Sequence, residues 1–270
     1  MTRMASKKVV AVMVLSALVA SAEVAVASGA CEALARQDVA TSRKGHIPGL
    51  GDVTATVGWD NRIELTLATR DFEITRAITP SKEVEITISG RGELIPLTIR
   101  LGGREGLRVA RGANVVTGTE AAAAFRSMTD GRVVSAFREH MGNYERRLMA
   151  GATVRPDDPH AYGFLLVGAF VASLSGDPTA VGRARDLIAT RLQGRVRQVR
   201  ADFKNCVAEY EKYLLQVDQA RTSCLQSAEA QDSWWQRSSQ RLLCEAEFVA
   251  GALSGEGQFI ACSALLPLVK

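Results

Sequence analysis

Four cysteines near the end of the chain are placed symmetrically about Trp234. Cys224 and Cys244 lie 10 residues before and after it, and Cys206 and Cys262 lie 28 residues before and after it. If one helix precedes Trp234 and an antiparallel helix follows it, the inner two cysteines meet and the outer two meet. The spacing therefore predicts a helical hairpin closed by two nested disulfides, Cys224–Cys244 and Cys206–Cys262, although four cysteines allow two other connectivities.

The predicted hairpin, residues 195–270, also follows helical periodicity. In each half the two cysteines are 18 residues apart, which is five helical turns, so both sulfur atoms lie on one face. Apolar residues in the first half repeat in alternating steps of four and three, the heptad pattern of packed helices. Reflection about the turn sets Gly251 against Val217 and Gly255 against Tyr213. Small residues thus face large ones at successive levels.

Several glycines disfavour a continuous second helix, because a glycine in a helix interior lowers helix stability by about 1 kcal/mol relative to alanine. The stretch Ser254–Gly257 contains two glycines and is a candidate helix break. We expect the helix to continue through it, because glycine permits close packing against a tyrosine, and a break or kink there is the alternative.

The first 22 residues have the features of a secretory signal peptide. Basic residues precede an apolar run over 9–19, and Ala20-Ser21-Ala22 fits a cleavage site, with cleavage as late as residue 30 as the alternative. The run has 11 residues, short of the ~20 that span a bilayer. Disulfides persist in oxidising compartments, so the predicted disulfides agree with the predicted signal peptide. We therefore expect an exported protein of bacterial type, periplasmic or extracellular.

Charge gives no indication of a nucleic-acid partner. The chain has 33 basic and 29 acidic residues, but three basic residues and no acidic ones lie in the signal peptide. The mature protein is therefore nearly neutral, and we expect it to bind no nucleic acid.

Cys31 has no symmetric partner. Either it is a free or intermolecularly bonded thiol, or it is lipidated, because Ser28-Gly29-Ala30-Cys31 resembles a bacterial lipoprotein box. That resemblance implies a lipid-anchored envelope protein, although leucine is preferred where Ser28 stands. We expect contact with a membrane only if Cys31 is lipidated.

Between the signal peptide and the hairpin, the sequence changes from a strand pattern to a helix pattern. Residues 23–50 are expected to be a leader with little regular structure, and residues 51–117 an antiparallel β domain, a small sandwich or barrel. Apolar and polar residues alternate there, as in Val84-Glu85-Ile86-Thr87-Ile88, between turn signals such as Gly102-Gly103. Residues 118–194 read as helices, with Asp-Pro starts at 158–159 and 177–178. The fold class is therefore α+β.

The sequence contains few candidates for chemistry. Three histidines, His46, His140 and His160, form no spaced metal motif, and no nucleophile elbow or phosphate-binding loop is present. Paired cysteines are not nucleophiles. We assign no catalytic residue, metal or cofactor, and interpret the arginines between 183 and 200 as a solvated helical face.

We expect a non-enzymatic binding or scaffolding protein of the cell envelope. Trp234 and Trp235, at the predicted hairpin turn, are the candidate contact with a protein or envelope partner. One alternative is an exported hydrolase with a site between the β and helical domains, with His140 or His160 in it. The other is a lipid-anchored envelope factor.

Overall fold

The computed structural model describes residues 41–58, 60, 62–90, 95–103, 106–128, 131–152, 160–192 and 204–265. An antiparallel sheet is followed by helices, which confirms the α+β class. The predicted signal peptide, Cys31 and the Asp158-Pro159 helix start lie outside the described residues.

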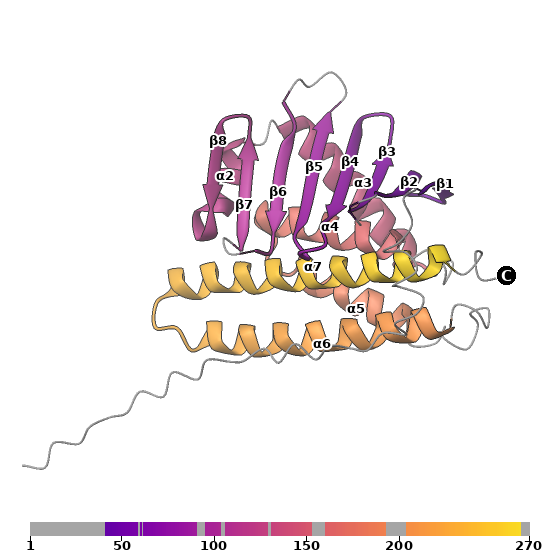
Figure 1. Cartoon of the computed structure of the whole chain (residues 1–270). Helices are drawn as coiled ribbons and strands as arrows, with labels where there is room; N and C mark the ends of the chain where they lie inside the picture. Colours follow the sequence, from indigo (N-terminus) through magenta and orange to yellow (C-terminus); the bar gives the residue numbers. More distant parts are fainter. Residues whose placement is uncertain are drawn as a thin grey trace, which may run out of the picture.

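Eight strands form one sheet in which neighbours along the chain are neighbours in space (Figure 1). The strands are β1 (Thr41–Ile47), β2 (Gly51–Val57), β3 (Ile63–Ala68), β4 (Phe72–Ile78), β5 (Val84–Gly90), β6 (Leu97–Leu101), β7 (Leu107–Arg111) and β8 (Asn114–Thr117). Every pair of neighbours is antiparallel. Strands β2 to β7 follow the alternating pattern of the sequence, whereas β8 does not alternate.

Helices, and not a second sheet, cover the apolar face of these strands. Phe72 of β4 packs edge-on against Phe137 of α3 (Gly131–Met149), with ring centroids 5.5 Å apart. A methyl group at Gly257 of α7 (Trp234–Leu265) would lie 3.0 Å from Ile78. Within the described residues the strands therefore form a single meander sheet with helices on its apolar face, and the expected sandwich or barrel is not confirmed, because an alternating pattern shows that one face is buried but not what buries it.

The sheet begins earlier than the sequence indicated. Strand β1 lies in the segment expected to be an irregular leader, and pairs with β2 from Thr41 opposite Val57 to Ile47 opposite Gly51. Among its described side chains only Ile47 is buried. An edge strand with so little apolar surface has no period-2 signal, which is why the pattern missed it.

The remaining helices are η1 (Gly118–Glu120), α2 (Ala121–Met128), α4 (His160–Leu174), α5 (Ala180–Leu192) and α6 (Lys204–Glu229). In helix α4 every residue from 161 to 171 is buried. Gly176 lies two residues after the end of α4, and its φ of 113° suits glycine. Asp177 then accepts a hydrogen bond from the Thr179 N–H, 3.1 Å away, just before α5.

Helices α6 and α7 lie side by side and are joined by a turn at residues 230–233 (Figure 1). Helix α7 continues through Ser254–Gly257 without a break. A methyl group at Gly251 would overlap Val217, and one at Gly255 would overlap Tyr213. These glycines therefore stand against the two large residues that the sequence set opposite them, and they allow the helices to approach closely.

Candidate functional site

The turn between α6 and α7 is held by its own polar groups. The Ser233 hydroxyl accepts a hydrogen bond from the Gln236 N–H, 3.1 Å away, which caps the first turn of α7. The Arg237 guanidinium donates to the carbonyl oxygens of Gln231 and Asp232, at 2.8 and 3.2 Å. Both ends of the turn are thus fixed by side-chain contacts, and we call residues 229–241 the tip.

Trp234 and Trp235 are the most exposed aromatic side chains of the described part of the chain. They are 68% and 62% exposed, and their ring centroids are 6.1 Å apart. Tryptophan is highly buried on average, so two neighbouring indoles in water are unusual. The tip therefore presents a small apolar surface to solvent.

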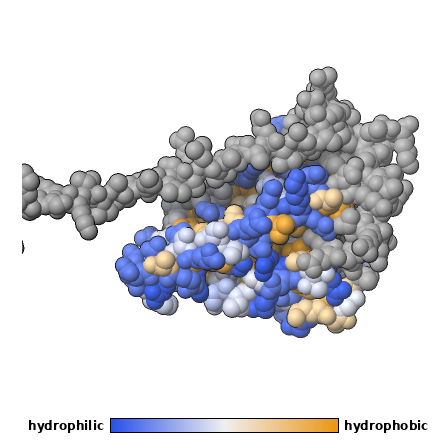
Figure 2. Space-filling model, turned by 90° about the horizontal axis from the view of Figure 1, so that it is seen from below, coloured by the Kyte–Doolittle hydropathy of each residue, from blue (hydrophilic) through white to orange (hydrophobic). Residues whose placement is uncertain are grey.

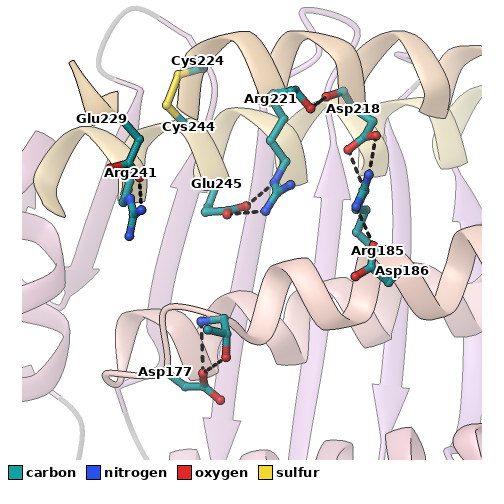
Figure 3. A network of polar contacts seen from close by, with 12 residues as sticks. Asp177, Arg185, Asp186, Asp218, Arg221, Cys224, Glu229, Arg241, Cys244 and Glu245 are labelled. Carbon is teal, nitrogen blue, oxygen red and sulfur yellow. Dashed lines mark hydrogen bonds and ion pairs between the residues drawn. A yellow bond between two sulfur atoms is a disulfide. The ribbon is translucent and has the colours of Figure 1, made fainter. Parts of the chain in front are cut away.

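Covalent and ionic links brace the helices behind the tip (Figure 3). The predicted Cys224–Cys244 disulfide is present, with Cα atoms 5.7 Å apart. Arg241 forms an ion pair with Glu229 across the turn, and the largely buried Arg221 and Glu245 share two hydrogen bonds of 2.6 and 2.7 Å. Helices α6 and α7 are therefore joined at several levels on the side of the tip.

The outer pair of cysteines is described only in part. Cys206 is disulfide-bonded and buried. The side chain of Cys262 lies outside the described part of the structure, so the Cys206–Cys262 bond stays a prediction.

A second polar cluster lies inside the molecule. Arg76 of β4 and Glu256 of α7 are both fully buried and share two hydrogen bonds, of 2.5 and 2.9 Å. The guanidinium also lies 4.1 Å from the ring centroid of Phe164 on α4. Gly163 makes room for the pair, because a methyl group there would overlap both charged side chains. This ion pair joins the sheet to α4 and α7.

Electrostatics keep Glu256 charged. Burial raises the pKa of the Glu256 carboxyl, but the positive charge of Arg76 and the nearby His160 side chain lower it by more, so the pKa lies below its usual range. His160 Nδ1 is 3.5 Å from Glu256 Oε1, and its side chain is 21% exposed. Burial and the Glu256 charge raise the pKa of the Tyr210 phenol. Glu256 is therefore a carboxylate whose two oxygens both accept hydrogen bonds from Arg76.

The three histidines do not converge. His46 contacts Asp52 at 2.7 Å on the exposed β1–β2 pair, and His140 Nε2 lies 2.6 Å from the Leu50 carbonyl oxygen. A surface hollow at the ends of β3, β4 and β5 is lined by none of them; its lining residues are Ala68, Thr69, Arg70, Phe72, Glu73, Ser89 and Gly90. Within the described ranges, no three His, Cys, Asp or Glu residues group as metal ligands.

The described arginines of the 183–200 series have protein partners. Arg183 pairs with Asp177 at 2.9 Å. Arg185 pairs with Asp218 of α6 at 2.8 Å (Figure 3). Arg191 donates to the Leu148 carbonyl oxygen. Arg183 thus contacts the start of its own helix, whereas Arg185 and Arg191 link α5 to α6 and α3, which a purely solvated helical face would not do. Seen from the side of α6, the surface is mostly hydrophilic with separate hydrophobic areas (Figure 2).

The sequence predicted the tip but did not predict the Arg76–Glu256 pair. A signal was present: Arg76 occupies a buried-face position between Ile74 and Ile78, and Glu256 stands between Gly255 and Gly257. A charge among buried positions requires a partner. The pattern gives no indication of which one, because the two residues are 180 positions apart.

Comparison with protein-family models, curated proteins and solved structures found no significant match. Among the described helices, none is long and apolar enough to cross a membrane.

Proposed function

We propose that this chain is an exported, non-enzymatic binding or scaffolding protein of the bacterial-type cell envelope, and that Trp234 and Trp235 contact its partner. The observation that carries the proposal is the exposure of both indoles, 68% and 62%, on a turn held by side-chain contacts. Aromatic side chains of this kind are enriched at binding surfaces.

Rigidity supports the same interpretation. A binding surface that is already ordered loses little conformational entropy when its partner arrives. The tip is braced by the Cys224–Cys244 disulfide and the Arg241–Glu229 ion pair. We include the Cys206–Cys262 disulfide in this proposal, so that a hairpin closed at two levels carries the tip.

The buried ion pair supports a scaffolding role. Arg76 and Glu256 tie α7, which begins at the tip, to the centre of the sheet. Arg185 and Asp218 tie α6 to α5. The tip is therefore held in a defined position relative to the rest of the molecule, as a protein that displays a contact surface requires.

Binding to a washed envelope fraction of the producing cells tests the proposal. The exported protein is mixed with the fraction, the fraction is sedimented, and the retained protein is measured for wild type and for the Trp234→Ala, Trp235→Ala double variant. A Leu215→Ala, Met149→Ala variant is the control, since these side chains are 59% and 66% exposed on other surfaces. We expect only the tryptophan variant to lose binding. Equal retention of all three proteins would contradict the proposal.

The exported hydrolase is the second candidate, because His160 lies 3.5 Å from a carboxylate. Both oxygens of that carboxylate accept hydrogen bonds from Arg76, which disfavours a role as a general base.

A lipid-anchored envelope factor is the third candidate, and intact mass measurement of the mature N-terminus tests it. A diacylglyceryl mass on Cys31 is the expected result in that case.

A further inference from the structure

We propose that the tip binds the surface of a phospholipid bilayer, with Trp234 and Trp235 inserted among the lipid headgroups. The inference rests on the proposed contact role of these two residues and names the partner. It differs from the expectation that only a lipidated Cys31 would bring the protein to a membrane.

The tip has the shape that insertion into a bilayer requires. Trp234 and Trp235 are consecutive residues at the start of α7, beside the turn that ends the α6–α7 pair (Figure 1). Both are exposed on this turn, so the apolar surface is a protrusion and not a groove. A protrusion suits insertion into a soft surface.

The exposed apolar surface of the two indoles is small. A tryptophan side chain buries up to about 250 Å², so exposed fractions of 68% and 62% leave on the order of 300 Å² for the pair. A stable protein interface uses about 800 Å² on each partner. The indole pair supplies less than half of that area. A bilayer interface sets no such minimum, because each apolar side chain that enters it contributes independently.

The tip has no net charge that would attract it to anionic groups. The tip carries Glu229 and Asp232 against Arg237 and Arg241, so its formal charges cancel. Both arginines are also occupied, Arg241 by Glu229 and Arg237 by the turn carbonyls. Attraction to anionic groups is therefore not the driving force. Tryptophan is enriched at the membrane–water interface, where its ring is apolar and its N–H still finds a hydrogen-bond partner.

Polar side chains surround the two indoles. Gln231, Asp232, Ser233 and Gln236 are exposed next to the indoles, and a hydrogen-bonded headgroup layer accommodates them. The hydrocarbon core does not, since unsatisfied polar groups there are expensive. The insertion depth is therefore limited to the headgroup layer, and no helix of the described chain is required to span the bilayer.

Vesicle co-sedimentation tests the inference with the exported protein in a Cys31→Ser background, which removes any contribution of a lipid on Cys31. Phosphatidylcholine vesicles are compared with vesicles that also contain phosphatidylglycerol, at low and high salt. We expect binding to both, little dependence on salt, and at least a tenfold weaker partition for the Trp234→Ala, Trp235→Ala variant. The Leu215→Ala, Met149→Ala variant should bind as wild type does. Circular dichroism and the intact Cys224–Cys244 bond verify that each variant is folded.

Each other outcome overturns the inference. Equal binding by the tryptophan variant shows that another surface is responsible. Binding that requires phosphatidylglycerol and disappears at high salt shows an electrostatic contact. No vesicle binding, together with tryptophan-dependent binding to the envelope fraction, identifies a protein or other envelope partner and leaves the proposed function intact. If the protein does not bind vesicles and its binding to the envelope fraction does not depend on the tryptophans, neither proposal holds.

Discussion

Arg76 on β4 and Glu256 on α7 form a fully buried ion pair with two hydrogen bonds, although 180 positions separate them in the sequence. Burial removes both charges from water, and that penalty is offset only while each has the other. The pair therefore adds one specific polar contact to the apolar packing of α7 against the sheet.

A double-mutant cycle measures this contact. Arg76→Met and Glu256→Leu are each expected to lower the free energy of unfolding by about 3–5 kcal/mol, because each leaves one buried charge unpaired. The double variant should be more stable than either single variant, since no unpaired charge remains. Denaturant unfolding provides the values. Arg100→Met, which breaks the partly exposed pair with Glu85, is the control and should cost about 1 kcal/mol or less. Additive effects at positions 76 and 256 would contradict this prediction.

Acid should weaken the start of α5. Hydrogen bonds from Arg183, opposed by partial burial and aided by Thr179, lower the pKa of the Asp177 carboxyl from 3.8 to about 2. Because the folded pKa lies below the unfolded one, this stabilisation is present above about pH 4 and is lost as the pH falls through about 2. Asp177→Asn keeps a capping side chain but removes the titrating carboxyl, so the variant should lose less free energy of unfolding than wild type as the pH falls from about 4 to about 2. The expected difference is less than about 1 kcal/mol, because the Asp177 side chain is partly exposed. Urea unfolding at several pH values measures it; an unchanged pH profile would count against the assignment.

Two glycine-to-alanine substitutions should have opposite effects. Gly255→Ala places a methyl group against Tyr213, so we expect a loss of about 1–3 kcal/mol despite the higher helix propensity of alanine. Gly142→Ala on α3 meets nothing within 4 Å and should raise stability by roughly 0.5–1 kcal/mol. Thermal and denaturant unfolding compare the two variants. A stabilising Gly255→Ala would mean that the helices separate at this level without penalty.

The disulfides are expected to stabilise the α6–α7 pair. Replacing Cys224 and Cys244 by serine opens a link between residues 20 positions apart and should lower the free energy of unfolding by about 3 kcal/mol in the chain-entropy model. Peptide mapping without reduction should recover Cys224 with Cys244 and Cys206 with Cys262. A link from Cys206 to any other cysteine would refute the symmetric arrangement.

Local patterns predicted those parts of the fold whose cause is local. Strands β2 to β7 follow period-2 alternation, and α5 follows the Asp177-Pro178 start. The facing of Gly255 and Tyr213 followed from the symmetric arrangement of the cysteines and helical periodicity. Strand β1 could not be read, since an exposed edge strand has no alternation to detect.

The sequence by itself determined strands β2 to β7, the change from strands to helices and the turn at the tip, and it favoured the pairing of the inner cysteines, because these depend on periodicity and short spacings. Only the tertiary structure decided that helices cover the sheet, that Arg76 pairs with Glu256, and that both Trp234 and Trp235 stay exposed. Such features depend on which surfaces meet in space, and burial patterns specify that a surface is covered without specifying by what.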